Sequence, residues 1–122
     1  MLKVRPKLKV LIVDDSELNR EMLGSMLGNE YEILEAENGA QAVEILREHI
    51  SDLSLILLDV QMPQMDGLEV LIRMNQSHWI DSIPVVMISS ETAPKFIERA
   101  YDLGATDYIA RPYNTMIVRR RV

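Results

Sequence analysis

Short apolar runs and amphipathic segments alternate along the whole chain. Five runs are rich in aliphatic residues and too short to cross a membrane, which is typical of buried strands. After each run, apolar residues recur every three or four positions, the period of a helix with one buried face. The expected strands are residues 8–13, 31–36, 54–59, 84–88 and 107–110, and the expected helices are about 16–27, 40–49, 68–75, 94–103 and from 114 onward.

This alternation predicts an α/β fold with a parallel sheet covered by helices on both faces. With 122 residues and no internal repeat or linker, the chain is expected to form a single domain over residues 1–122. In the first helix, the apolar residues expected on the inner face are Leu18, Met22, Leu23, Met26 and Leu27.

Composition excludes several classes of protein. The chain has no cysteine, so disulfides and thiolate metal sites are impossible. Residues 1–9 are too basic and too poor in apolar residues for a signal peptide, and no apolar stretch reaches membrane length, so we expect a cytoplasmic protein without membrane contact. Between residues 10 and 118 lie all 19 acidic side chains but only six of the 13 basic ones. Such a body repels phosphate backbones, which argues against direct binding of nucleic acid.

Polar side chains stand at the ends of four predicted strands. Asp14 and Asp15 follow the first strand, Asp59 ends the third, Ser89 follows the fourth and Arg111 the fifth. The carboxyl ends of parallel strands share one edge of the sheet, so these groups are expected to converge where open α/β sheets bind ligands. Taken singly, the aspartates would also suit helix capping, the serine a loop hydroxyl and the arginine a surface ion pair.

Together these groups suggest phosphoryl chemistry. Three crowded carboxylates repel one another unless a hard cation such as Mg²⁺ lies between them. No histidine or cysteine is placed to favour zinc or copper. With the charge neutralised, one carboxylate can attack a phosphoryl donor and form an acyl phosphate, while a hydroxyl and a fixed cation hold the phosphoryl oxygens.

These segments resemble the receiver domain of bacterial two-component response regulators. The resemblance rests on VDDSELNR at residues 13–20, LILLDVQMPQMDGLEV at 55–70, PVVMISS at 84–90 and GATDYIARPY at 104–113. It implies a flavodoxin-like fold with five helices and the strand order 2-1-3-4-5. It also implies a phosphoprotein that relays a signal and catalyses only its own phosphorylation and dephosphorylation, without turning over an external substrate.

The resemblance also implies roles for individual residues around the metal. Asp59 matches the phospho-accepting aspartate and Asp15 the direct Mg²⁺ ligand. Asp14 matches the neighbour that holds metal-bound water, and the backbone carbonyl of Gln61 would complete the site. The side chains of Gln61 and Glu91 would set how fast the phosphoryl group is lost.

Two further positions match the family's switch residues. Ser89 falls at the hydroxyl that follows the phosphoryl group, and Tyr108 at the aromatic residue that turns inward with it. An ordinary half-buried strand tyrosine is the alternative for Tyr108.

Two positions depart from the family pattern. Arg111 stands where the family has lysine, and Ser90 where a smaller residue is usual. Arginine is longer and forked, so it would either clamp the phosphoryl oxygens or pair with Asp59 at rest. The alternative function is therefore a pseudo-receiver, an interaction module that does not switch by phosphorylation. A third possibility is a Mg²⁺-dependent phosphatase with an aspartyl nucleophile. Such an enzyme would need an acid two residues after the nucleophile, and the presence of Gln61 at that position argues against it.

The resemblance implies partners outside this sequence. A sensor histidine kinase or phosphotransfer protein would donate the phosphoryl group, and a C-terminal or separate output domain would respond. Homodimerisation through the last strand and helix is a habit of the family. The final segment TMIVRRRV is short for the family, so we expect a receiver cut from a longer regulator. Its ending resembles receivers joined to domains that make or degrade cyclic di-GMP.

Overall fold

A computed structural model describes residues 8–59, 66–89, 94–110 and 115–121 of the chain. These residues form a five-stranded sheet in the order β2-β1-β3-β4-β5 with all neighbouring pairs parallel. The fold class and strand order expected from the sequence are confirmed. The strands are β1 (Leu8–Val13), β2 (Tyr31–Ala36), β3 (Leu53–Asp59), β4 (Val85–Ser89) and β5 (Asp107–Ala110).

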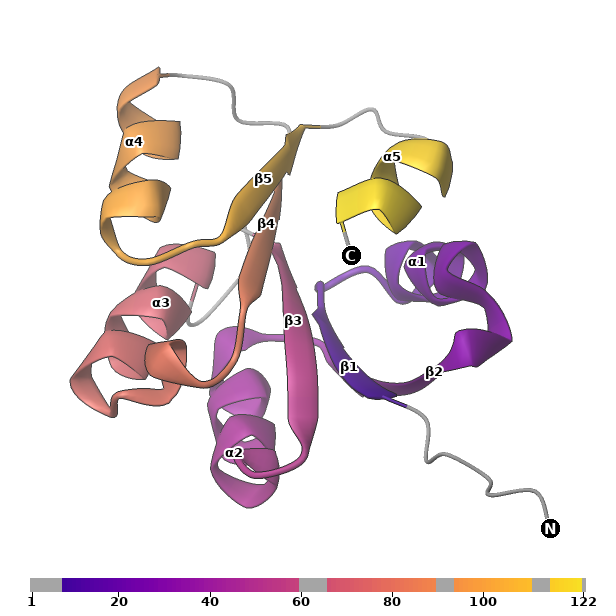
Figure 1. The fold of residues 1–122 in the computed structure, drawn as a ribbon, viewed down its shortest axis with the longest axis horizontal. Coiled ribbons are helices and arrows are strands. Elements are labelled where there is room, and N and C mark those ends of the chain that lie inside the picture. Colours follow the sequence, from indigo (N-terminus) through magenta and orange to yellow (C-terminus); the bar gives the residue numbers. More distant parts are fainter. Residues whose placement is uncertain (1–7, 60–65, 90–93, 111–114, 122) are drawn as a thin grey trace, which may run out of the picture.

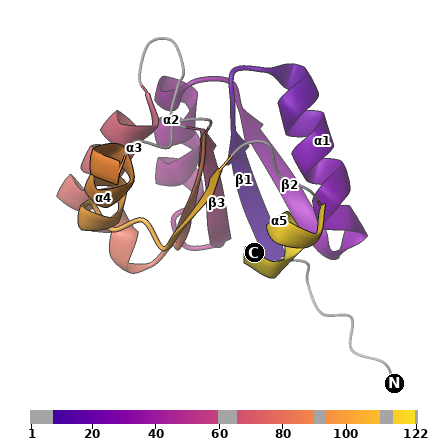
Figure 2. The ribbon, with the colours of Figure 1, turned by 90° about the horizontal axis from the view of Figure 1, so that it is seen from above.

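Helices cover both faces of this sheet. In Figures 1 and 2, α1 and α5 lie on one face, and α2, α3 and α4 lie on the other. No helix in the described ranges has the length and apolar character needed to cross a bilayer. The helices are α1 (Glu17–Leu27), α2 (Gly39–His49), α3 (Gly67–Gln76), α4 (Pro94–Asp102) and α5 (Thr115–Arg121), with short 3₁₀ turns η1 (Gly28–Glu30) and η2 (Trp79–Asp81).

The core forms one apolar layer on each side of the sheet. Strand β1 shows why, because its side chains alternate between the two faces. Val10 and Ile12 join a buried cluster with Leu23 of α1 and Val118 of α5. The residues between and after them join the cluster beneath α2, α3 and α4. With both faces buried, the strands need continuous apolar runs, and these runs position the polar residues at the strand ends.

The prediction for the inner face of α1 was wrong at two positions. Leu23 and Leu27 are buried, and Met26 is partly buried against the core. Leu18 and Met22, however, are 65% and 43% exposed. Met22 is turned about 100° around the helix axis from Leu23. The sheet covers only one side of α1, and the apolar positions of this helix extend beyond it.

A charged cluster closes the edge of the sheet where the strands begin. Lys9 Nζ donates a hydrogen bond of 2.7 Å to Asp52 Oδ2, and His49 Nδ1 lies 3.1 Å from Asp52 Oδ1. The hydrogen bond from Lys9 lowers the pKa of Asp52, with a further contribution from His49. The same bond raises the pKa of Lys9. The cluster ties the start of β1 to the turn between α2 and β3.

Acid is therefore expected to remove a contribution of Asp52 to stability. Because its folded pKa is lowered, this contribution is present above the unfolded value of about 4 and disappears as the pH falls through the folded value. Urea unfolding at pH 7 should show Asp52→Asn to be less stable than the parent. The difference should shrink steadily below pH 4, and a difference that stays constant down to pH 2 would contradict this assignment.

Candidate functional site

Three carboxylates converge at the edge of the sheet where the strands end. Asp59 is the last residue of β3, and Asp14 follows β1, the strand paired with β3 on one side. The pairing of Val13 with Leu58 brings Asp14 to the level of Asp59. One carboxylate oxygen from each of Asp14, Asp15 and Asp59 lies within 4.8 Å of the others. The structure thus brings together the three acids that the sequence predicted to meet.

Asp14 is held at this edge by its backbone and its side chain. Its amide donates to the carbonyl of Ala36 at 3.1 Å, which ties the end of β1 to β2. Its Oδ1 accepts a hydrogen bond of 2.9 Å from the amide of Ser16. Ser16 is the N-cap of α1, and its hydroxyl accepts from the amide of Asn19. The N-cap is therefore Ser16 and neither of the aspartates, while Asp14 makes a turn with the cap residue and also converges on Asp59.

Burial strengthens the repulsion between the carboxylates of this site. Asp14 and Asp59 are 1% and 4% exposed, whereas Asp15 is open to solvent. Carboxylates this close repel one another, and burial strengthens the repulsion because water screens it less. The set offers only hard oxygen ligands and an open side toward solvent. It therefore fits Mg²⁺, which prefers oxygen ligands and retains several waters.

The two predicted switch residues lie on the neighbouring strands. Ser89 is the last residue of β4 and is 1% exposed. Asp59 pairs with Ile88, so Ser89 is one position further along the strand beside β3. Tyr108 lies on β5, pairs with Met87 and is 8% exposed. The tyrosine belongs to the core cluster beneath α4 and is more buried than the half-buried alternative expects.

The remaining predicted positions fall outside the described residues. These are Gln61, Ser90, Glu91 and Arg111.

One residue beside the site was missed by sequence reasoning. Arg20, on the first turns of α1, donates from Nη1 to the carbonyl of Asp14 at 2.7 Å. Its Nε donates to Glu35 Oε1 at 3.0 Å. A cation near a helix N-terminus opposes the helix dipole. This placement was the available signal that Arg20 needed an anionic or carbonyl partner, but nothing in the sequence of α1 indicates that these partners are the Asp14 carbonyl and Glu35 of β2.

Comparisons with known proteins agree with this geometry. The model of the response regulator receiver domain family matches residues 10–122. A probable cyclic di-GMP phosphodiesterase of Vibrio cholerae is 34% identical over 113 residues, 93% of this chain but 25% of that protein. A two-component response regulator of Oryza sativa subsp. indica is 34% identical over 112 residues, 91% of this chain and 76% of that protein.

Solved structures give the same result. A chain of the CheX–CheY–BeF3–Mg complex of Borrelia burgdorferi superposes with a TM-score of 0.87 at 28% identity, over 93% of this chain and 85% of that one. CheY4 of Vibrio cholerae gives a TM-score of 0.86 at 28% identity, over 95% and 96% of the two chains. The converging carboxylates, the strand order and the match over residues 10–122 lead to one conclusion: this chain belongs to the response regulator receiver domain family.

Proposed function

We propose that this domain is a switch in which a partner histidine kinase or phosphotransfer protein phosphorylates Asp59 in a Mg²⁺-dependent reaction. The observation that carries the proposal is the convergence of the Asp14, Asp15 and Asp59 oxygens within 4.8 Å at the ends of two adjacent strands. A bound cation would neutralise part of the repulsion among these three carboxylates.

The chemistry assigns a part to each residue. An oxygen of the Asp59 carboxylate attacks phosphorus, and the bond to the donor breaks with its electron pair leaving on the donor group. Asp14, Asp15, Asp59 and the Gln61 carbonyl would hold Mg²⁺, which supplies positive charge against the carboxylates and phosphoryl oxygens. The Ser89 hydroxyl donates to a phosphoryl oxygen.

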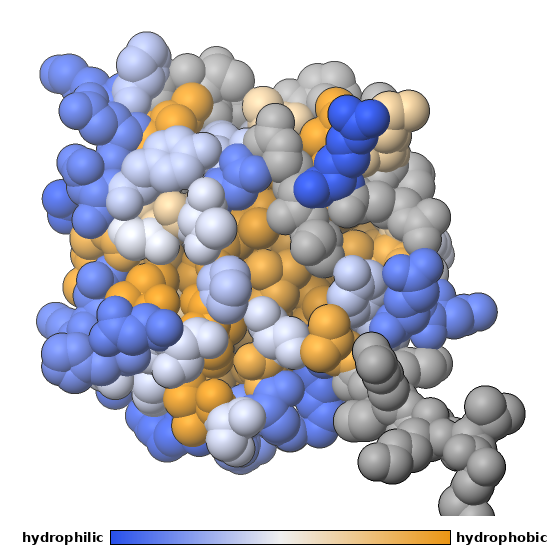
Figure 3. Space-filling model, in the orientation of Figure 1, coloured by the Kyte–Doolittle hydropathy of each residue, from blue (hydrophilic) through white to orange (hydrophobic). Residues whose placement is uncertain are grey.

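The pairing of the last strands supports a route from the site to the surface. Ser89 pairs with Ala110, and Tyr108 pairs with Met87 two positions earlier on the same two strands. A movement of Ser89 toward a phosphoryl group therefore acts directly on β5, the edge strand between α4 and α5. We assign output control and homodimerisation to the surface that α4, β5 and α5 form at this edge of the sheet, the side seen in Figure 2. Figure 3, in the orientation of Figure 1, shows apolar residues gathered in the middle of the molecule and charged residues toward its rim.

The names of relatives suggest the wider context. The chain spans 9% of histidine kinase P4 of Formosa agariphila and 25% of the Vibrio cholerae phosphodiesterase. By analogy, we propose that the domain works in the cytoplasm within a longer regulator or beside a separate output protein.

The test is the intact mass of the chain after incubation with acetyl phosphate and Mg²⁺. We expect the gain of one phosphoryl group, and we expect EDTA or Asp59→Asn to abolish it. Asp52→Asn is the matched control, because it removes an aspartate at the opposite edge of the sheet. Equal phosphorylation of Asp59→Asn and the parent would refute the assignment of the acceptor.

Arg111 gives a reason to keep the pseudo-receiver as a second candidate. A chain that binds Mg²⁺ but gains no mass would favour it. In that event, phosphorylation of the Arg111→Lys variant would identify the arginine as the block. Lysine carries the same charge in a compact ammonium group, whereas the guanidinium of arginine is a larger planar fork.

A further inference from the structure

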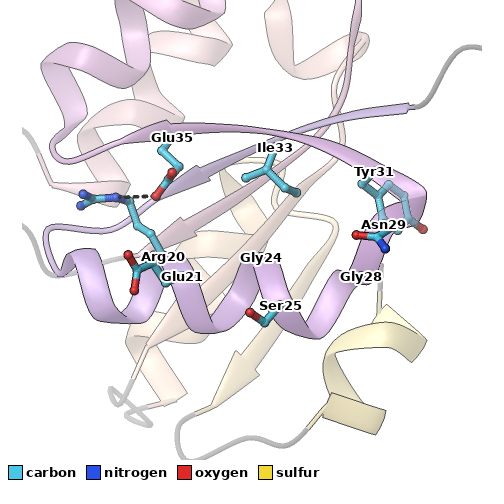
Figure 4. Close-up of a pocket in the computed structure, with 9 residues that line it drawn as sticks. All are labelled: Arg20, Glu21, Gly24, Ser25, Gly28, Asn29, Tyr31, Ile33 and Glu35. Atoms are coloured by element: carbon cyan, nitrogen blue, oxygen red, sulfur yellow. Dashed lines mark hydrogen bonds and ion pairs between the residues drawn. The ribbon is translucent and has the colours of Figure 1, made fainter.

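Arg20 connects three parts of the molecule that meet beside the carboxylates. It projects from α1, donates to the backbone of Asp14 at the end of β1, and pairs with Glu35 on the edge strand β2. Figure 4 shows Arg20 and Glu35 facing each other at one end of the groove between α1 and β2. The groove has a volume of about 800 Å³, and its lining does not include Asp14, Asp15 or Asp59.

The position of this contact matters because of what the Asp14 carbonyl belongs to. It is part of the peptide unit that joins Asp14 to Asp15, and a peptide unit is planar and rigid. A hydrogen bond that fixes this oxygen therefore also fixes the amide nitrogen and the starting direction of Asp15. Asp14 has additional anchors through its amide and Oδ1. Asp15 is exposed, so burial does little to hold its side chain in place. The orientation of this peptide is therefore a restraint on the least buried of the three aspartates.

We propose that Arg20 is a positioning residue for the cation site, which orients Asp15 by holding the peptide between the two aspartates. Glu35 holds the guanidinium in turn: the Arg20 side chain is 12% exposed and that of Glu35 is 48% exposed. The fork of arginine lets one nitrogen bond the carbonyl while another bonds the carboxylate, a geometry that lysine does not reproduce. This inference rests on the proposed function, because it requires that the site binds Mg²⁺.

Two effects of Arg20 on Mg²⁺ binding have opposite signs, which makes the inference testable. A positive charge near an acidic cluster disfavours a cation, so on Coulomb's law alone its removal would tighten Mg²⁺ binding. If Arg20 positions Asp15, its removal loosens a ligand and weakens binding. Loss of a group that orients a metal ligand typically lowers metal affinity 10- to 100-fold. We expect the lower end for Arg20→Met, an increase of about tenfold in the Kd of Mg²⁺.

The experiment is isothermal titration calorimetry of the unphosphorylated chain with MgCl₂, for the parent, Arg20→Met, Arg20→Lys and Glu35→Gln. Arg20→Lys and Glu35→Gln should weaken binding less than Arg20→Met, because each retains part of the arrangement. They also keep the test valid if Arg20→Met fails to fold. The matched control is Arg47→Met, which breaks an exposed arginine–glutamate pair on α2 and should leave the Kd unchanged.

The possible results separate this inference from the proposed function. Unchanged or tighter Mg²⁺ binding by the Arg20 variants would overturn the inference, even if their unfolding temperature without Mg²⁺ falls, and would leave a purely structural link between α1 and β2. The proposed function would stand in that case, provided that the parent binds Mg²⁺ and gains a phosphoryl group. A parent that binds no Mg²⁺ overturns both.

Discussion

Replacement of Asp15 by asparagine is expected to remove most of the stabilisation of the domain by Mg²⁺ and to make the metal-free chain more stable. Three carboxylates that approach within 4.8 Å repel one another when no cation is bound. Loss of one charge relieves part of this repulsion, and we expect about 1 kcal/mol because Asp15 is open to solvent. In a domain of this size, that gain raises the unfolding temperature by about 4 °C.

The response to Mg²⁺ should change in the opposite direction. Carboxylate count largely sets the affinity of oxygen-ligand sites, so we expect Asp15→Asn to weaken Mg²⁺ binding about 100-fold. At a concentration of 100 times the parent Kd, Mg²⁺ would stabilise the parent by about 2.7 kcal/mol and the variant by about 0.4 kcal/mol. Urea unfolding in EDTA and in Mg²⁺ measures both quantities.

Asp52→Asn is the control, since Asp52 lies at the opposite edge of the sheet and is paired with Lys9. It should lose stability equally in EDTA and in Mg²⁺. If Asp15→Asn destabilises the metal-free chain, or if Mg²⁺ stabilises it as much as the parent, the three acids do not form a cation site.

The architecture could be predicted because it depends on patterns within each segment. The apolar run before Asp59 is buried at residues 55–58, and it ends at the carboxylate as expected. Parallel strands then bring their carboxyl ends to the same edge of the sheet, whatever the sequence between them. For this reason the sequence could predict that Asp14 and Asp59 lie close together although they are far apart along the chain. The flavodoxin-like strand order came from the family resemblance.

What sequence reasoning missed depends on the neighbours of a segment. The exposure of Leu18 shows this, because helical periodicity cannot tell how much of α1 the sheet covers. Arg20 shows it again. Its two partners are the backbone carbonyl of Asp14, just after β1, and a carboxylate on β2, and a carbonyl leaves no trace in the sequence.

The largest loss of stability is expected from Gly104→Ala. Gly104 follows α4 with a φ of +102°, a conformation that side chains with a Cβ rarely adopt. A Cβ there would also approach Ile80 Cγ1 of η2 to 2.8 Å, so the turn after α4 or η2 would have to move. Backbone strain costs about 1–2 kcal/mol, and overpacking costs about 1–3 kcal/mol. We expect a combined loss of about 3 kcal/mol, measured by urea unfolding.

Two other glycines separate these contributions. Gly28 has a φ of +76° with a ψ of −163° and open space around its Cβ position, so Gly28→Ala should cost only the strain, about 2 kcal/mol. Gly24 lies within α1, where a Cβ would touch only Ile33 at 4.0 Å, so Gly24→Ala should stabilise by about 1 kcal/mol through helix propensity. In an Ile80→Ala background, the cost of Gly104→Ala should fall toward that of Gly28→Ala. If the cost does not fall, the backbone strain at φ +102° accounts for the whole loss of stability. The close contact with Ile80 of η2 would then not be a reason for glycine at position 104.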